Sequence, residues 1–245
     1  MDTIPIDAAT TKAAPPRIAS VPHLVGFLAA QTGLVALGVL GHDRTLEGSS
    51  DFYFRHAVAV NVALYLTMIP FEIALLTYCW FGVYKSGGNL KTLSRGRWFS
   101  GRHILRDVAI AIPFWFLLQA LSWVAIRFLG PESVDPGGGL LPKAIPEVLA
   151  WLCVSLCAGV CEELVYRGYL QQQLHAVVGN LPVAIVGQGL VFGAVHSYQG
   201  WKGTIVVCVI GTLLGVLAAW RRNLRSNVVV HAWIDIWEGW LKFAI

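Results

Sequence analysis

Long apolar segments dominate this sequence and limit what it can fold into. Seven stretches are apolar and long enough, some of them barely, to approach the roughly 20 helical residues that cross a bilayer. They are 22–40, 57–84, 108–126, 147–166, 181–197, 203–220 and 227–243. Because a bilayer offers no water to backbone N–H and C=O groups, such segments form helices. The sequence therefore predicts an all-α fold, a polytopic membrane bundle of about seven transmembrane helices.

The composition agrees with a membrane protein and excludes several other classes. The chain is 56% hydrophobic and 13% charged, whereas a soluble domain carries about a quarter charged residues. The net charge is only +4, and no basic run interleaved with aromatic residues is present, so we expect membrane lipids and no nucleic acid as partners. The five cysteines lie in apolar stretches without a C-x-x-C pair, which favours packing between helices over disulfides or a zinc knuckle.

The chain divides into a tail and two groups of helices within one membrane domain. Residues 1–21 are polar, contain two adjacent prolines and lack the features of a secretory signal, so we predict a disordered N-terminal tail. Residues 22–146 hold the first transmembrane helices. Residues 147–245 hold the remaining helices and most of the polar residues inside apolar segments.

Lysine and arginine in the loops predict the orientation. The 85–107 loop has six of these residues and the 221–226 loop has three. Cytoplasmic loops carry such an excess. Seven helices with both loops inside place the N-terminus in the cytoplasm and the C-terminus outside.

Few ionisable residues remain within the predicted helices, and these are unusual because a carboxylate in hydrocarbon costs at least ~2.5 kcal/mol on insertion scales. The strong candidates are Glu72, Glu162, Glu163, Arg167, His196, His231 and Asp235. Arg167 follows Glu163 by four residues, one helical turn, which predicts an ion pair. His231 and Asp235 have the same spacing.

A predicted hairpin brings two of these residues to one depth. The segment 177–182 contains Gly-Asn and Pro and reads as a turn between two helices. Glu163 lies seventeen residues before Asn180, and His196 lies sixteen residues after it. At 1.5 Å per residue, both sit about 25 Å from the turn, so a carboxylate is expected opposite an imidazole.

Structural roles compete with functional ones at single positions. A lone histidine near a helix end, or a Glu–Arg pair at one-turn spacing, is commonly structural. Glu72, beside Pro70, is better explained as a structural partner or part of a kink than as a catalytic group. Two glutamates, two histidines and an aspartate on neighbouring apolar helices are harder to explain by packing. Taken together, this set indicates a functional site.

Three short motifs occur in order on successive predicted helices. They are E-E-x-x-x-R (Glu162, Glu163, Arg167), F-x-x-x-H (Phe192, His196) and H-x-x-x-[N/D] (His231, Asp235). In these motifs the chain resembles the CAAX-protease and bacteriocin-processing family of intramembrane proteases, known as CPBP or ABI, over residues 147–245. The resemblance implies an endopeptidase of a bacterial inner or plasma membrane whose substrate is a peptide or a lipidated, prenyl-like protein. It also implies that Phe192 contacts the substrate.

The resemblance also implies catalytic roles. Glu162 is the expected base that activates water, with Glu163 in support. Because adjacent helical residues point about 100° apart, both cannot face one spot. Glu163 is therefore expected to pair with Arg167. His231 is the expected oxyanion donor or second water ligand, with Asp235 as its partner.

The residues leave the cofactor open. An ionised aspartate at 235, where the prenyl-protease branch more often has asparagine, can orient His231 or bind a cation. Glu162, His196 and His231 could then be zinc ligands. The family is described both as metalloproteases and as metal-independent glutamate proteases, and no H-E-x-x-H pair decides between them.

Two other classes of function remain as alternatives. A proton- or cation-coupled transporter also gathers carboxylates at mid-membrane, although the inverted repeat common in transporters is not evident in this sequence. A non-catalytic scaffold or bacteriocin-immunity protein would keep the fold without turnover.

Overall fold

The computed structural model describes residues 15–42, 51–95, 101–130 and 141–244, and every regular element within these ranges is a helix. The α-helices are α1 (Val21–His42), α2 (Asp51–Lys85), α3 (Leu90–Ser94), α4 (Gly101–Leu129), α5 (Ile145–Glu162), α6 (Gln171–Val178), α7 (Leu181–Val195), α8 (Gly200–Arg221) and α9 (Arg225–Ala244). A π-helix, η1 (Glu163–Leu170), joins α5 to α6, and a short 3₁₀ turn, η2 (Ser197–Gln199), precedes α8. The all-α prediction is confirmed.

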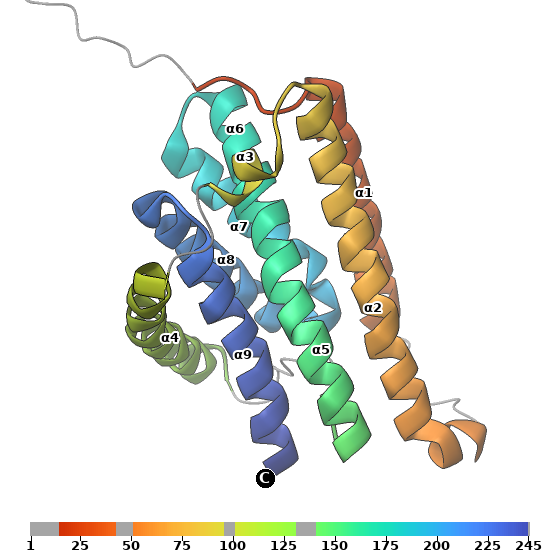
Figure 1. Cartoon of the computed structure of the whole chain (residues 1–245). Helices are drawn as coiled ribbons and strands as arrows, with labels where there is room; N and C mark the ends of the chain where they lie inside the picture. The colour runs from red at the N-terminus through yellow and green to blue at the C-terminus, as the bar shows by residue number, and fades with distance from the viewer. Residues whose placement is uncertain (1–14, 43–50, 96–100, 131–140, 245) are drawn as a thin grey trace, which may run out of the picture.

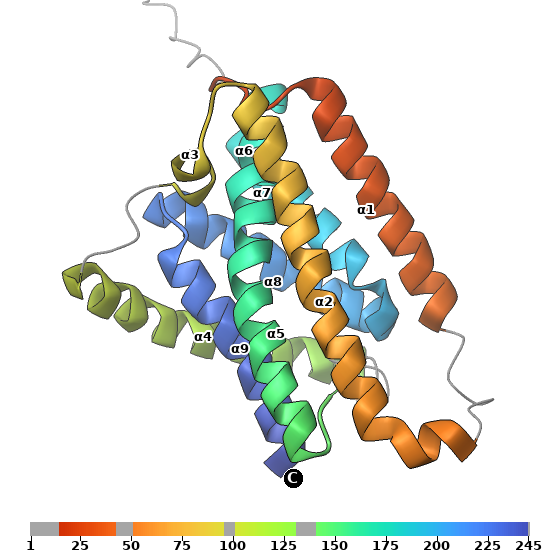
Figure 2. The same ribbon diagram turned by 45° about the vertical axis from the view of Figure 1, so that its right-hand side comes forward.

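The long helix formed by α5, η1 and α6 is central to the bundle (Figure 1). Its α5 part packs between α2 and α9, and α7 packs along α8. The α4 helix crosses the bundle obliquely and packs mainly on α9, as Figure 2 shows from a second direction. Residues distant in sequence are thereby brought together around the middle of the central helix.

Five stretches of the described residues are helical, long and apolar enough to cross a membrane. They are Val21–Val39, His56–Lys85, His103–Leu129, Ile145–Val178 and Ser197–Arg221. The protein is therefore a polytopic integral membrane protein. Each of the seven predicted segments coincides with a helix, but α7 is shorter than a span, and α9 is not among the five candidates. Seven crossings thus stay a prediction.

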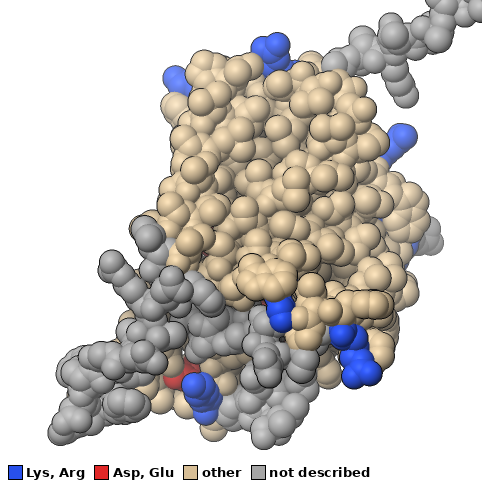
Figure 3. Space-filling view, turned by 180° about the vertical axis from the view of Figure 1, so that it is seen from behind, with Lys and Arg blue, Asp and Glu red and all other residues tan. Residues whose placement is uncertain are grey.

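The outer surface suits a bilayer. In the view from behind, a broad belt of uncharged side chains separates basic side chains at the upper edge from others in the lower part (Figure 3). Large apolar side chains such as Leu105, Phe116 and Trp123 are exposed. Contiguous exposed apolar surface of this kind marks a face that contacts membrane or another protein.

Turn residues set the helix boundaries near the centre. Gly179 has φ of 71°, a left-handed conformation that glycine adopts without strain, and it ends α6. The side chain of Asn180 then accepts a hydrogen bond from the backbone N–H of Val183 at 3.1 Å and caps α7. The predicted turn at 177–182 is confirmed.

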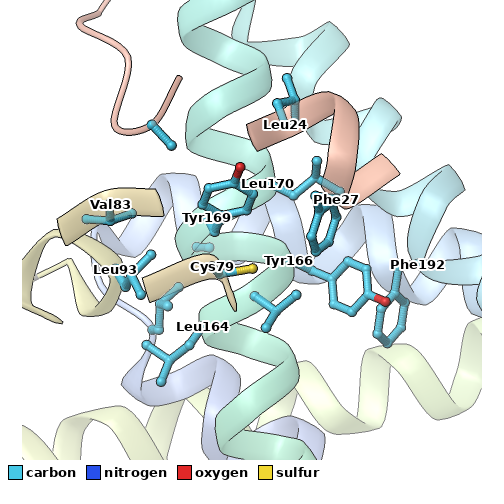
Figure 4. Close-up of a cluster of buried hydrophobic side chains, with 14 residues drawn as sticks. Leu24, Phe27, Cys79, Val83, Leu93, Leu164, Tyr166, Tyr169, Leu170 and Phe192 are labelled. Atoms are coloured by element: carbon cyan, nitrogen blue, oxygen red, sulfur yellow. The ribbon is translucent and has the colours of Figure 1, made fainter. Parts of the chain in front are cut away.

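The largest buried cluster surrounds η1 (Figure 4). Tyr166 and Tyr169 of η1 point into it, and Phe27 of α1 packs edge-on against both rings. Cys79 of α2 is fully buried in the same cluster, in agreement with a packing role. This cluster fixes η1 against α1 and α2, and thus fixes the segment that carries the first sequence motif.

The C-terminal end of the predicted tail contacts the bundle. Residues 1–14 lie outside the described residues. The backbone N–H groups of Ile18 and Ala19 both donate to Oε1 of Gln173 at 3.0 and 3.1 Å, and Ala19 is buried. Ile18 and Ala19, which lie within the predicted tail, are therefore held against α6.

Candidate active site

The E-E-x-x-x-R motif lies where the central helix changes its hydrogen bonding. Glu162 is the last residue of α5, and η1 continues from Glu163 as eight residues of π-helix, all of them buried. π-Helical turns are rare and are frequently found at functional sites. The motif thus coincides with an irregular segment inside a membrane-spanning helix.

Glu163 and Arg167 form the ion pair that their spacing predicted. Nη1 of Arg167 donates to Oε1 of Glu163 at 2.8 Å, and both side chains are fully buried. Nη2 of Arg167 donates to the carbonyl oxygen of Gly211 at 3.1 Å. The guanidinium also lies over the ring of Phe192, 4.4 Å from its centroid. Arg167 therefore connects the central helix to α7 and α8.

His231 joins this network from α9. Its Nδ1 lies 2.8 Å from Oε1 of Glu163, and Nδ2 of Asn227 donates to the other carboxylate oxygen at 3.1 Å. Asn227 also donates to the carbonyl oxygen of Leu214 at 2.7 Å. Glu163 consequently accepts hydrogen bonds from two residues of α9, which fixes the position of the imidazole.

Close packing of α5 against α9 brings these side chains within hydrogen-bonding distance. A Cβ atom at Gly159 would lie 2.9 Å from the backbone nitrogen of Ala232. Gly159 precedes Glu163 by one turn, and Ala232 is next to His231. Only glycine permits this approach, and it is what brings the two helices within side-chain reach.

The side chain of Glu162 points in a different direction from that of Glu163. It lines a cavity of about 760 Å³ between α1, α2, α5 and α9, together with His196, His231 and Asp235. Its Oε2 lies 3.5 Å from Nε2 of His231 but has no hydrogen-bond partner among the described residues. Of the two adjacent glutamates, the cavity is lined by Glu162, while Glu163 is buried behind it.

His196 reaches the same cavity from the C-terminal end of α7. Its Nδ1 lies 2.7 Å from the carbonyl oxygen of Phe192. Because a carbonyl only accepts, Nδ1 carries the hydrogen, and Nε2 of the neutral ring keeps a lone pair. His196 can therefore accept a proton or hold a water molecule through Nε2.

Phe192 lies at the centre of the aromatic contacts. Its ring centroid is 4.9 Å from that of Tyr166, 4.8 Å from that of His196 and 5.8 Å from that of His231. Phe192 is only 3% exposed and contributes to the wall of a second cavity. It orders the catalytic candidates by packing, and its predicted contact with substrate stays a prediction.

The second cavity, of about 700 Å³, lies between α4, α8 and α9. His196, His231, Asp235 and Glu238 line both cavities. Oδ2 of Asp235 lies 3.8 Å from Nε2 of His231, consistent with the predicted partnership. The candidate site therefore lies where two cavities adjoin.

Several residues of this site were missed or interpreted otherwise from the sequence. Glu72, expected to be a structural partner, lines the first cavity with its carboxyl group next to that of Glu162. Asn227 and Glu238 were not singled out. Asn227 precedes His231 by one turn and Glu238 follows Asp235 by three residues, so helical spacing along α9 could have identified both.

The zinc hypothesis does not gain support from the geometry. No group of three or more His, Cys, Asp or Glu side chains within the described ranges is arranged to hold a metal ion. Nδ1 of His196 is bonded to a backbone carbonyl and Nδ1 of His231 is bonded to Glu163, which leaves Nε2 of each ring as the nitrogen that could bind a metal. Zinc held by Glu162, His196 and His231 therefore stays a prediction, and we derive no chemical step through a metal.

Comparison with known proteins adds one finding. Residues 144–237 match the family model for Rce1-like proteins, described as type II CAAX prenyl endopeptidase Rce1-like. The matched residues include all three motifs, whereas α1 to α4 lie outside the match. No curated protein and no solved structure matches the chain. The resemblance drawn from the motifs is confirmed.

Proposed function

We propose, on the premise that residues 144–237 belong to the CAAX-protease family, that this protein is an intramembrane endopeptidase in which Glu162 activates water. One observation carries the proposal. Glu162 and His196, from different helices, line the same cavity. The buried Oε2 of Glu162 has no hydrogen-bond partner among the described residues, and Nδ1 of His196 is the ring nitrogen bonded to Phe192, which leaves its Nε2 as an acceptor. These two acceptors can hold one water molecule between them.

The remaining residues suit the other requirements of peptide hydrolysis. The water attacks the carbonyl carbon of the substrate while its proton moves to the carboxylate of Glu162. His231, in the charged form with a hydrogen on each ring nitrogen, donates from Nε2 to the oxygen that becomes negative in the tetrahedral intermediate. Glu162 then passes its proton to the amine nitrogen as the C–N bond breaks, which returns the carboxylate to its starting state.

Glu163 and Arg167 act behind this chemistry as positioning residues. Glu163 accepts from Nδ1 of His231 and so fixes which nitrogen faces the cavity. Arg167 keeps Glu163 ionised and in place. We further propose a peptide or a lipidated protein as substrate and a bacterial inner or plasma membrane as location, with the N-terminus in the cytoplasm.

A cleavage assay on the purified full-length protein in detergent tests this function. Wild type should cleave members of a panel of plain and lipidated peptides, and Glu162→Gln and His196→Ala should not. His175→Ala is a matched histidine control on α6, outside both cavities, and should retain activity. A chelator should leave the rate unchanged.

Two outcomes would contradict the proposal. If Glu162→Gln cleaves at the wild-type rate, water activation by Glu162 is wrong. If no peptide is cleaved while ion or proton flux through reconstituted vesicles depends on Glu162, the transporter alternative is favoured.

A further inference from the structure

The charged residues that line the two cavities at the candidate site are mostly acidic. Acidic side chains from α2, α5 and α9 line them: Glu72, Glu162, Asp235 and Glu238. The basic groups facing them are His196 and His231. No lysine or arginine lines either cavity in the described part of the chain. Arg167 is fully buried, and its guanidinium already donates to the carboxylate of Glu163 and to the carbonyl oxygen of Gly211.

The acidic residues extend beyond the three motifs. Glu238 follows Asp235 by three residues, so both lie on one face of α9, and both line the two cavities. Glu72 lines the first cavity from α2, where its carboxyl group is hydrogen-bonded to that of Glu162, and its Oε2 has no hydrogen-bond partner among the described residues. The hydrolysis proposed above assigns no chemical step to Glu72 or Glu238.

Ser155 independently indicates a ligand in the first cavity. It lies on α5 two turns before Glu162 and lines the same cavity. Ser155 is 1% exposed, and its Oγ finds no hydrogen-bond partner in the described part of the chain. A buried hydroxyl without a partner costs about 1–3 kcal/mol, so a ligand that supplies a donor would recover this cost. Serine Oγ accepts readily from an ammonium or guanidinium N–H.

The acidic lining of the cavities favours a substrate with a positive charge near the scissile bond over one with a negative charge. A substrate cut close to its C-terminus, as in C-a-a-X processing, brings a free carboxylate near the scissile bond. In these cavities that carboxylate would face like charges without a lysine or arginine to compensate it, and such juxtaposition costs several kcal/mol. A lysine or arginine side chain would instead be attracted, and desolvation inside the bundle strengthens the attraction.

We propose that the cavity beside Glu162 binds a cationic side chain of the substrate, held by Glu72, Asp235 and Glu238 with Ser155 as a further acceptor. The preferred substrate is therefore a peptide with lysine or arginine near the scissile bond, and a free C-terminal carboxylate in the cavity is disfavoured. Cleavage of this substrate rests on the proposed peptidase function. Binding of the basic peptide does not.

Binding of matched peptides tests this inference. One apolar peptide is made with Lys, Gln or Glu at a single central position, each with a C-terminal carboxylate or amide and a fluorescent label. Kd is measured by anisotropy on full-length His196→Ala in a nonionic detergent, so that hydrolysis does not interfere. We expect the Lys peptide to bind at least about tenfold more tightly than the Glu peptide. Amidation of the C-terminus should tighten binding.

Variants of Glu238 test whether the preference for the Lys peptide arises in the cavity. Glu238→Gln should reduce the Lys-to-Glu ratio, and Glu238→Lys should reverse it. Val177→Lys places a lysine at an exposed position of α6 outside both cavities and changes the net charge by +1, as Glu238→Gln does, and it should leave the ratio unchanged. Should Glu238→Lys fold poorly, Glu238→Gln, which keeps the side-chain volume, decides the question.

The failure of this inference differs from the failure of the peptidase proposal. Equal Kd values for the Lys and Glu peptides, or a ratio that Glu238→Gln leaves unchanged, overturn the cationic subsite even if wild type cleaves every peptide. A charge preference that follows Glu238, without hydrolysis by wild type, supports the subsite and counts only against the peptidase.

Discussion

The imidazole of His231 is held by the carboxylate of Glu163, with 2.8 Å between Nδ1 and Oε1. Since an ionised carboxylate only accepts, Nδ1 carries the hydrogen, and Nε2 faces Oε2 of Glu162 at 3.5 Å. His231 thus contacts two adjacent glutamates of one helix that have different environments. Glu162 lines the cavity, and Glu163 is fully buried with an arginine partner.

These environments predict opposite effects for the same substitution. Glu163→Gln leaves the buried guanidinium of Arg167 without a counter-charge, which should cost about 3–5 kcal/mol of unfolding free energy. Glu162→Gln removes a carboxylate whose Oε2 has no hydrogen-bond partner among the described residues, so its melting temperature should equal or exceed wild type while cleavage is lost. Thermal unfolding in detergent, with the cleavage assay, measures both. Equal destabilisation of the two variants would contradict the assigned environments.

Arg167 should tolerate substitution poorly. Arg167→Ala leaves Glu163 as a buried unpaired carboxylate and should lower stability by about 3–5 kcal/mol. Arg167→Lys restores the charge but not the second hydrogen bond to Gly211 or the stacking on Phe192, so we expect only partial recovery. Size-exclusion profiles and thermal unfolding of the two variants test this. An Arg167→Ala protein as stable as wild type would mean that the ion pair contributes nothing.

Local features of the sequence predicted much of this structure. The ion pair between Glu163 and Arg167 follows from one-turn spacing, and the turn at 177–182 follows from residues that favour it. The apolar segments predicted the helices because hydrophobic length is a property of each segment alone. These features need no knowledge of how the helices pack.

Features that depend on helix rotation and packing could not be predicted. Counting residues from the turn at 177–182 placed Glu163 opposite His196. In the structure, however, Glu162 lines the cavity that His196 lines. A difference of one residue is a rotation of about 100°, and the rotation is set by the approach of Gly159 to Ala232. Segment length likewise does not establish how many helices cross the membrane.

Asn227 should contribute to both stability and catalysis. Asn227→Ala removes the donor to Oε2 of Glu163 and the donor to the Leu214 carbonyl, which should cost about 1–3 kcal/mol for each buried group left unpaired. We also expect kcat to fall, because Glu163 then holds His231 less firmly. The matched control is Asn61→Ala, which removes a buried Asn–Glu hydrogen bond outside the cavities. The control should lose stability but keep kcat; a similar kcat for both variants would limit Asn227 to a structural role.

Glycine at the contact of α7 with α8 should matter for the position of His196. A Cβ at Gly193 would lie 2.6 Å from the backbone nitrogen of Cys208, so Gly193→Ala forces the helices apart and should cost about 1–3 kcal/mol. Gly187→Ala on the same helix meets only the end of Leu174, at 3.4 Å, and should be neutral or slightly stabilising. Thermal unfolding of both variants checks this, and equal stability of the two would show that α7 and α8 adapt without cost.

The orientation predicted from loop charges can be tested at two exposed residues on either side of α4. Ser86 follows α2 beside the basic 85–107 loop, and Lys143 precedes α5. Because α4 alone is long enough to cross the membrane between them, the two residues should lie on opposite sides. In a cysteine-free background, a membrane-impermeant maleimide should label Lys143→Cys in intact cells and label Ser86→Cys only after permeabilisation. The reverse pattern would place the N-terminus outside, and labelling of both from one side would show that α4 does not cross the membrane.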